Sequence, residues 1–113
     1  MALMDLRDKA AIVAVGYSDK QGTVPDTSEM HLALEACKSA IEDAGLKRED
    51  IDGLLIQPSI GGSIHSYDIA AQLGLDLRFT ANVDVMGASA GCIAQYAAMA
   101  VALGQANYVV CLY

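Results

Sequence analysis

The sequence predicts an α/β protein built around a mainly parallel β-sheet. Short apolar runs alternate along its 113 residues with longer segments whose apolar residues recur at helical spacing. Two of these runs, residues 10–15 and 52–56, are apolar almost throughout, which is typical of strands that are buried on both faces. Strands that alternate with helices pair in parallel through right-handed crossovers, so we expect one sheet with helices packed against it.

The first predicted helix follows the strand at residues 10–15. Asp26 and Glu29 have the spacing of a capping box, so the helix should begin there, and Gly45 should end it. The apolar residues of this segment fall on one stripe, while most of its charged residues fall on the opposite face. The predicted stripe consists of Met30, Ala33, Leu34, Cys37, Ile41 and Ala44.

The middle of the chain contains two further strands and a short helix. The strand at residues 52–56 leads into a loop at residues 57–63, and a helix at residues 66–73 should end at Gly74. Residues 79–85 are more polar and alternate, as expected of a strand at an edge or an interface.

The uncharged stretch at residues 85–113 contains the helix that should be most deeply buried. Residues 88–103 are small and apolar nearly all round, so this helix should be central and covered on every side. Gly104 ends it, and residues 108–113 should form the last strand. The whole stretch is long enough to span a bilayer, but its glycines and polar side chains favour burial in protein over a membrane span.

The composition excludes several classes of protein. Seven Lys and Arg residues against fourteen Asp and Glu residues give a net charge of −7, which argues against a nucleic-acid-binding surface. Hydrophobic residues make up 54% and charged residues 19%, which is enough for one packed core in one domain. Neither of the common glycine-rich phosphate-binding motifs occurs.

The cysteines predict neither a disulfide framework nor a metal site. Cys37, Cys92 and Cys111 are an odd number, and none of them has a partner at metal-ligand spacing. The first residues become charged at Asp5, without the apolar run of a secretory signal. A reducing cytoplasm is therefore the expected compartment.

The order of several segments resembles that of the thiolase superfamily, and more closely that of its sterol-carrier and lipid-transfer branch. The matching segments are residues 11–17, 28–46, 50–54, 71–75, 87–91, 97–101 and 104–106. They extend over almost the whole chain but correspond to only the first quarter to third of such proteins. The resemblance implies a thiolase-like N-terminal βαβαβαβ segment with a buried central helix, so residues 1–113 should be an incomplete part of one domain.

In this family a nucleophilic cysteine opens the central helix and takes up the acyl group of a coenzyme A thioester. The helix dipole and the free amides at that point stabilise the thiolate. Counted back from Gly104 with the family's spacing, the cysteine position falls on Gly87, which has no side chain. The resemblance leaves the backbone amides of Gly87, Ala88 and Ser89 as candidate substrate-binding groups for an enolate or an oxyanion. Alternatively, residues 87–91 are small only because the helix crosses the sheet closely.

Cys92 is the candidate for a displaced nucleophile. It lies five residues after Gly87, which on a helix is about 140° around the axis and about 7.5 Å along it. Its thiol should therefore point into the protein packing, where free cysteine is usually inert. Cys37 and Cys111 are interpreted as structural.

The two histidines are weaker candidates. His65 lies beside Tyr67 and Asp68 in a Gly/Ser-rich region and is interpreted as a solvated side chain, with a general base as the alternative. His31 falls on the outer face of the first helix, beside Glu35, and is interpreted as solvated.

Absence of the nucleophile favours the members of the family that cleave a carbon–carbon bond. Retro-aldol cleavage needs electrostatic stabilisation of an enolate but no acyl-enzyme. The resemblance therefore implies an aldolase that acts on the lipid or steroid side chain of an acyl-CoA, with the thioester as substrate and no covalently bound cofactor. A non-catalytic thiolase-like scaffold that binds lipid-CoA or a partner subunit is one alternative. An acetyl-CoA acyltransferase that uses Cys92 is another.

The resemblance also implies partners. Thiolase-like proteins generally form homodimers through the strand before the central helix, which is residues 79–85 in this sequence. Asn82 and Asp84 resemble positions near that contact, although single polar residues are equally compatible with a solvent-facing edge. Aldolases of this kind work with a small partner subunit of the OB-fold, zinc-ribbon type. Residues 1–113 on their own are expected to be inactive and poorly soluble.

Overall fold

The computed structural model describes residues 5–58 and 64–113, in which helices and strands alternate. The helices are α1 (Glu29–Asp43), α2 (Ser66–Leu73) and α3 (Ser89–Ala102). The strands are β1 (Gly53–Ile56), β2 (Phe79–Asn82) and β3 (Val109–Leu112). Two short 3₁₀ helices, η1 (Arg48–Asp50) and η2 (Met86–Ala88), precede β1 and α3.

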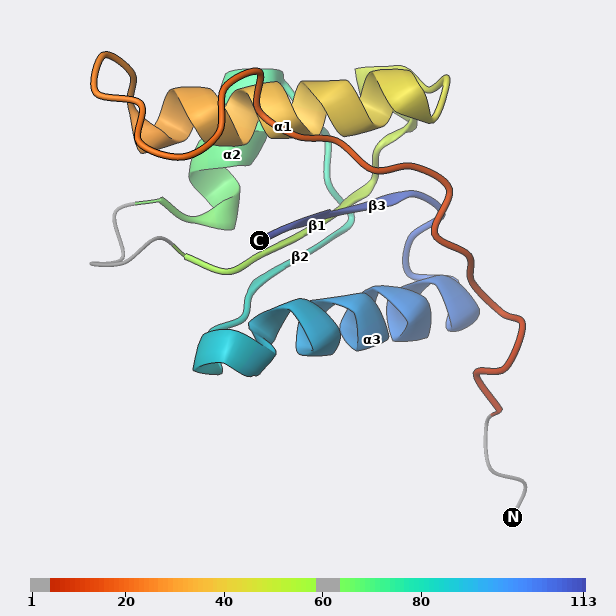
Figure 1. Cartoon of the computed structure of the whole chain (residues 1–113). Helices are drawn as coiled ribbons and strands as arrows, with labels where there is room; N and C mark the ends of the chain where they lie inside the picture. The colour runs from red at the N-terminus through yellow and green to blue at the C-terminus, as the bar shows by residue number, and fades with distance from the viewer. Residues whose placement is uncertain (1–4, 59–63) are drawn as a thin grey trace.

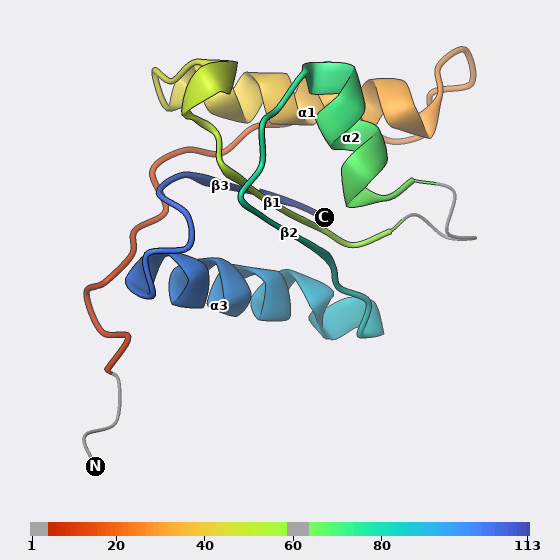
Figure 2. The same ribbon diagram turned by 180° about the vertical axis from the view of Figure 1, so that it is seen from behind.

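The strands form one parallel sheet in the order β2–β1–β3. Ile56, the last residue of β1, lies opposite Asn82 on one side and Leu112 on the other, so the carboxyl ends of all three strands meet at one edge. Figures 1 and 2 show α1 and α2 on one face of the sheet and α3 on the other. The predicted α/β architecture with a parallel sheet is confirmed.

The core has two layers because successive side chains of β1 point to opposite faces of the sheet. Leu54 and Ile56 are fully buried beneath α1 and α2, where they contact Cys37 and Ile69. Leu55 is fully buried on the other face, where it packs with Val83 and Ile93 against α3. The apolar run of this strand is therefore explained by burial on both faces, as predicted.

α1 follows the predicted stripe, but its first turn is capped by a different residue. Cys37 and Ile41 are buried within the stripe. The side chain of Ser28, rather than Asp26, accepts a hydrogen bond from the His31 amide at 3.1 Å, and the helix begins at Glu29. The prediction of Asp26 as the cap is wrong because the chain between Asp26 and Ser28 is not yet helical. The left-handed Gly45 follows the helix end, as expected.

The prediction of a buried first strand at residues 10–15 is wrong for the structure as described. The segment is extended but pairs with no strand, and Ile12 is 85% exposed. It runs along α1 instead (Figure 1), where a Cβ on Gly16 would lie only 2.6 Å from the carbonyl oxygen of Ala36. An apolar run becomes a buried strand only if a neighbouring strand and two covering layers are present, and none of the described residues supplies them here.

Within the described residues, α3 is covered on the side that faces the sheet and not on every side. Ile93 and Ala100 are buried against the sheet, whereas Tyr96, Met99 and Leu103 on or directly after the helix are exposed. The helix covers one face of a three-stranded sheet, and no described element lies against its outer side (Figures 1 and 2). The uniform apolarity of the sequence does not distinguish these two faces.

The remaining predicted elements have their expected places. α2 spans residues 66–73, and Gly74 after it is left-handed. β2 alternates between half-buried and exposed residues at the edge of the sheet, as its sequence pattern predicts. Among the described residues, no helix is both long enough and apolar enough to cross a membrane.

Candidate functional site

The candidate site lies in the turn that connects β2 to α3. Gly87 and Ala88 belong to η2, and Ser89 is the first residue of α3. The residue before them, Met86, has a φ of 56°, a left-handed conformation that is unfavourable for a side chain of its size. Its side chain is 76% exposed. A strained backbone in front of an exposed helix start is a feature of functional turns.

Gly87 faces open space. Apart from its chain neighbours, no described atom lies within 4 Å of the place where a Cβ would be. Gly91, one turn further along α3, has the same open surroundings, and neither glycine has a positive φ. Close packing therefore does not explain these two glycines, whereas it does explain Gly53 on β1, whose Cβ would lie 2.8 Å from the side chain of Val109 on the neighbouring strand β3.

The structure places Ala88 and Ser89 beside Gly87 but engages their polar groups inside the turn. The Ala88 amide donates to the carbonyl of Val85 at 3.3 Å, and the Ser89 amide donates to the carbonyl of Met86. The buried hydroxyl of Ser89 accepts from the Val85 amide at 2.9 Å and donates to the Met86 carbonyl at 2.7 Å. Ser89 therefore holds the strained turn closed.

Of the three amides predicted to bind substrate, only that of Gly87 is free to donate a hydrogen bond to a ligand. Among the described residues no acceptor is found for it, in contrast to the amides of Ala88 and Ser89. It lies at the start of a 14-residue helix, whose dipole favours negative charge at this end. The turn can thus present one free amide and the positive end of α3 to an enolate or an oxyanion.

Cys92 is half-buried on α3 and packs against the cluster formed by Leu55, Val83 and Ile93. Its side chain therefore contributes to the layer between α3 and the sheet. Cys37 is buried in the opposite layer, and burial raises the pKa of its thiol to about 11. The third cysteine, Cys111, is exposed on β3.

Polar side chains join the starts of α2 and of η2 at the carboxyl edge of the sheet. Asn82 accepts a hydrogen bond from the Ser66 amide at 2.8 Å, so the end of β2 holds the start of α2. Asp84 accepts from the Met86 amide at 3.2 Å and from the side chain of Gln57 at 3.4 Å. Sequence reasoning missed these roles, because the predicted strand runs on to residue 85, whereas β2 ends at Asn82 in the structure.

His65 lies at this same edge, directly before α2. Its Nδ1 is 3.2 Å from the hydroxyl of Tyr67 and 3.6 Å from a carboxylate oxygen of Asp68. The two rings stack with centroids 5.2 Å apart and planes 4° apart. His31 lies elsewhere, on the exposed side of α1, with its Nε2 2.8 Å from Glu35.

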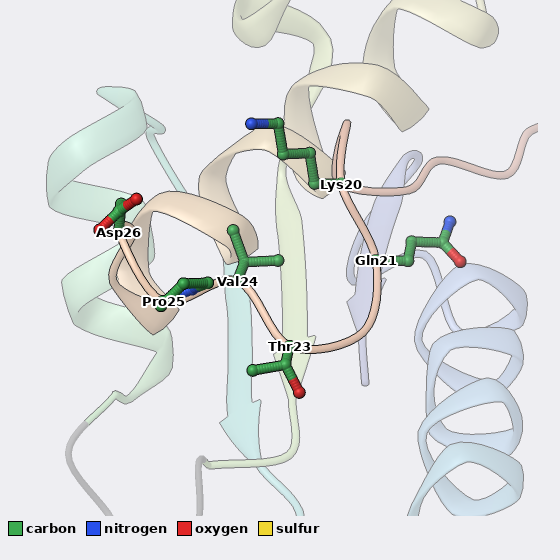
Figure 3. A pocket seen from close by; sticks show the side chains of 6 residues that line it. All are labelled: Lys20, Gln21, Thr23, Val24, Pro25 and Asp26. Atoms are coloured by element: carbon green, nitrogen blue, oxygen red, sulfur yellow. The ribbon is translucent and has the colours of Figure 1, made fainter.

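Two hollows of the described surface lie away from the candidate site. One of about 430 Å³ is formed by the loop before α1 (Figure 3) and is lined by Lys20, Gln21, Thr23, Val24, Pro25 and Asp26. A second, of about 250 Å³, lies between residues 16–21, α1 and the end of β3. Neither contains a predicted site residue. Within residues 5–58 and 64–113, no three His, Cys, Asp or Glu side chains are grouped to hold a metal ion.

Two curated proteins are similar to the chain over most of its length. A steroid side-chain-cleaving aldolase of Thermomonospora curvata is 40% identical in an alignment 107 residues long, which covers 90% of this chain and 26% of that protein. The 17-hydroxy-3-oxo-4-pregnene-20-carboxyl-CoA lyase of Mycobacterium tuberculosis is 38% identical over 105 residues. The alignment covers 93% of this chain and 27% of that protein. The chain thus spans about a quarter of the length of these relatives. No family model matches it.

Two solved structures share its fold. The Ltp2-ChsH2(DUF35) aldolase superimposes with a TM-score of 0.76 and 37% identity, over 89% of this chain and 26% of that one. A monomeric SCP2-thiolase-like protein type 1 from Mycobacterium smegmatis superimposes with a TM-score of 0.67 and 25% identity. The superposition covers 88% of this chain and 22% of that one. The chain is therefore related to the SCP2-thiolase-like proteins and has the α/β fold of the matching segment.

Proposed function

We propose that the chain is the N-terminal part of a thiolase-like acyl-CoA aldolase that cleaves the side chain of a steroid or another lipid. The similarity to two proteins named for this chemistry supports the proposal. So does the chemistry of the turn before α3, which offers a helix start but no nucleophilic side chain. A β-hydroxyacyl-CoA is the matching substrate, and no covalently bound cofactor is required.

The open space at Gly87 is the observation that carries the proposal. In a retro-aldol step, the bond between the α and β carbons breaks and its electron pair moves into the thioester as an enolate. A free amide at a helix start can stabilise the enolate oxygen. An absent side chain leaves room for the thioester to reach that amide, and nothing within the described chain requires glycine at this position.

The direct test uses the full-length protein and 17-hydroxy-3-oxo-4-pregnene-20-carboxyl-CoA, the compound that gives one relative its name. Release of a steroid ketone together with a shortened acyl-CoA, followed by liquid chromatography and mass spectrometry, supports the aldolase. Binding of the thioester without any product, with this or with shorter β-hydroxyacyl-CoA substrates, supports the alternative of a non-catalytic lipid-CoA scaffold instead.

Gly87→Ala tests the role of the open space. The added methyl group meets no described atom, so the fold should be unaffected. If the thioester occupies this space, the methyl group overpacks the complex by about 1–3 kcal/mol, and kcat/KM should fall by about 5- to 160-fold. Gly91→Ala is the matched control, because its Cβ also enters open space but one turn further along α3. Equal activity of both variants would contradict a thioester site at Gly87.

An acyltransferase that uses Cys92 makes a different prediction. It requires rapid acylation of the Cys92 thiol by acetyl-CoA, detectable by mass spectrometry of the intact protein. The place of Cys92 against Leu55 and Val83 favours an unmodified thiol. Loss of activity in Cys92→Ala together with an acetylated Cys92 peptide would favour the acyltransferase over the aldolase.

A homodimer through the β2 edge of the sheet, in the cytoplasm, belongs to the same proposal. β2 is an edge strand with exposed Thr80 and Asn82, so its outer side is open to a second copy. Thr80→Lys places a charge at that edge and should shift the full-length protein from dimer to monomer in sedimentation equilibrium. Thr23→Lys, in the loop before α1, should leave the mass unchanged. A monomeric wild-type protein, like the named neighbour, would overturn this part.

A separate small subunit of the OB-fold, zinc-ribbon type is the proposed second partner. The support is the Ltp2-ChsH2(DUF35) aldolase, whose name joins two components. Co-expression of the full-length protein with a DUF35 protein encoded near it should give a complex that co-purifies by gel filtration. If the cleavage activity is the same with and without that subunit, the partner is not part of the enzyme.

A further inference from the structure

The buried hydroxyl of Ser89 holds the peptide group that contains the Gly87 amide. The carbonyl of Met86 and the N–H of Gly87 belong to one peptide group, which is trans, so the two point in opposite directions. The Met86 carbonyl accepts hydrogen bonds from the Ser89 hydroxyl at 2.7 Å and from the Ser89 amide. Because this carbonyl is held toward Ser89, the Gly87 N–H is directed away from Ser89.

The backbone of the turn does not fix that direction by itself. Met86 has a left-handed φ of 56°, which a residue other than glycine rarely adopts. Gly87 tolerates a φ of either sign, so the peptide group between the two residues can rotate at the glycine without a steric penalty. The Ser89 hydroxyl opposes this rotation from two sides of Met86, because its oxygen also accepts from the Val85 amide at 2.9 Å.

The position of Ser89 makes its hydroxyl suited to this role. Ser89 is the first residue of α3 and is 0% exposed, so water does not compete for its two hydrogen bonds. A serine hydroxyl has one hydrogen to donate and lone pairs to accept, and the turn uses both. The bond that it donates to the Met86 carbonyl also polarises the shared peptide group, which makes the Gly87 N–H a stronger donor.

We propose that Ser89 is a positioning residue for the aldolase reaction and directs the Gly87 amide at the enolate oxygen of the thioester. The inference rests on the proposed function, in which that amide stabilises the enolate. Ser89 is buried beneath the turn and acts only through the peptide group of Met86 and Gly87. Negative charge on the oxygen develops during cleavage and is absent from the bound substrate. Loss of the hydroxyl should therefore lower kcat and leave KM nearly unchanged.

Ser89→Ala in the full-length protein tests the assignment, with 17-hydroxy-3-oxo-4-pregnene-20-carboxyl-CoA as substrate. Removal of a complete oxyanion donor lowers kcat by about 10²- to 10³-fold. The released Gly87 amide still points at the oxygen part of the time, so we expect kcat to fall about 10- to 100-fold. Ser28→Ala is the matched control, because it removes the serine hydroxyl that caps α1. It should lower the melting temperature without lowering kcat.

Ser89→Thr separates positioning from stability. Threonine keeps the hydroxyl, and on a helix it can bond the carbonyl three residues before it, which here is that of Met86. Its extra methyl group overpacks a buried site, so the melting temperature should fall. We expect kcat to stay close to that of the wild type nevertheless. A kcat that follows the melting temperature through Ser89→Ala, Ser89→Thr and Ser28→Ala, instead of following the Ser89 hydroxyl, overturns the assignment.

The same measurements separate this inference from the proposed function. If Ser89→Ala cleaves the thioester as fast as the wild type, or if only its KM rises, Ser89 does not position the amide while the aldolase proposal stands. If the wild-type protein cleaves no β-hydroxyacyl-CoA, the proposed function fails and this inference fails with it.

Discussion

Burial of the Cys37 thiol makes the stability of the protein depend on pH in the alkaline range. Burial raises the pKa of this thiol from an ordinary value of 9.0 to about 11. The unfolded chain loses the proton near pH 9, whereas the folded chain keeps it until about pH 11. The free energy of unfolding should therefore be unaffected below pH 9 and should fall between pH 9 and pH 11.

Urea unfolding of the full-length protein at pH 8, 9 and 10 measures this dependence. Cys37→Ala lowers the stability at every pH because it leaves a small cavity, but it should show less decline between pH 9 and pH 10. The difference between the two slopes isolates the thiol from the other groups that titrate there. Parallel slopes would show that Cys37 is not desolvated in solution.

Asp52 joins two distant parts of the chain through its carboxylate. It accepts hydrogen bonds from the amides of Asn107 at 2.9 and 3.0 Å and of Tyr108 at 2.9 Å. Hydrogen bonds to a charged group contribute about 1.5–3 kcal/mol each before solvent exposure is considered. Because Asp52 is partly exposed, we expect Asp52→Ala to lower stability by about 1–3 kcal/mol in total.

Amide hydrogen exchange measures the effect of Asp52 at the amides that its carboxylate binds. In Asp52→Ala, the amides of Asn107 and Tyr108 should exchange faster, whereas the central amides of α1 should not. Asp52→Asn keeps one acceptor oxygen without the charge and should lie between wild type and the alanine variant. Uniformly faster exchange across the whole domain would mean that the carboxylate stabilises the fold globally rather than this junction.

At the level of the elements, the start of α1 provides a paired test. Ser28 caps the helix, and Asp26 does not, although the sequence spacing favours Asp26. Ser28→Ala should lower the stability of the protein by about 1 kcal/mol. Asp26→Ala should change it by less than about 0.5 kcal/mol, since substitutions away from such contacts have small effects. Thermal unfolding of both variants measures the difference, and the reverse order would restore Asp26 as the cap.

The elements that sequence reasoning placed well are those whose signal is local. The period of α1, the left-handed Gly45 and Gly74, and the apolar run of β1 all depend on neighbours within a few residues. Residues 10–15 have an equally strong strand signal, but no strand among the described residues lies beside them. Pairing between strands depends on distant parts of the chain, and no local pattern reports whether a partner is present.

The candidate site likewise combines features that could be predicted before the structure with features that could not. The family resemblance implies that Gly87 stands where a nucleophilic cysteine would open the helix, and the structure places Gly87 in the turn before α3. The sequence does not predict that the Ser89 hydroxyl closes this turn or that Met86 adopts a left-handed φ. These depend on how residues 85–89 fold back on one another, and small residues permit many such turns.

On the scale of the whole molecule, uncharged surface is concentrated on the outer side of α3. Residues 85–113 contain no charged side chain, although the chain has a net charge of −7. Tyr96, Met99 and Leu103 are exposed at positions that lie along one side of the helix, roughly a quarter turn around its axis from the buried Ile93 and Ala100. Exposed apolar surface of this kind drives association, while the acidic residues elsewhere oppose it.

This distribution predicts how residues 1–113 behave when they are produced alone. The apolar side of α3 should bind a hydrophobic dye and cause concentration-dependent association, visible by light scattering. Met99→Lys together with Leu103→Lys should reduce both signals, because charges interrupt the apolar side. Replacing Lys38 and Glu42 on the exposed side of α1 by glutamine is the control, since these residues lie away from α3. If the double lysine variant associates as strongly as the wild-type segment, the association arises elsewhere, and the exposed residues 12–17 become the surface to change next.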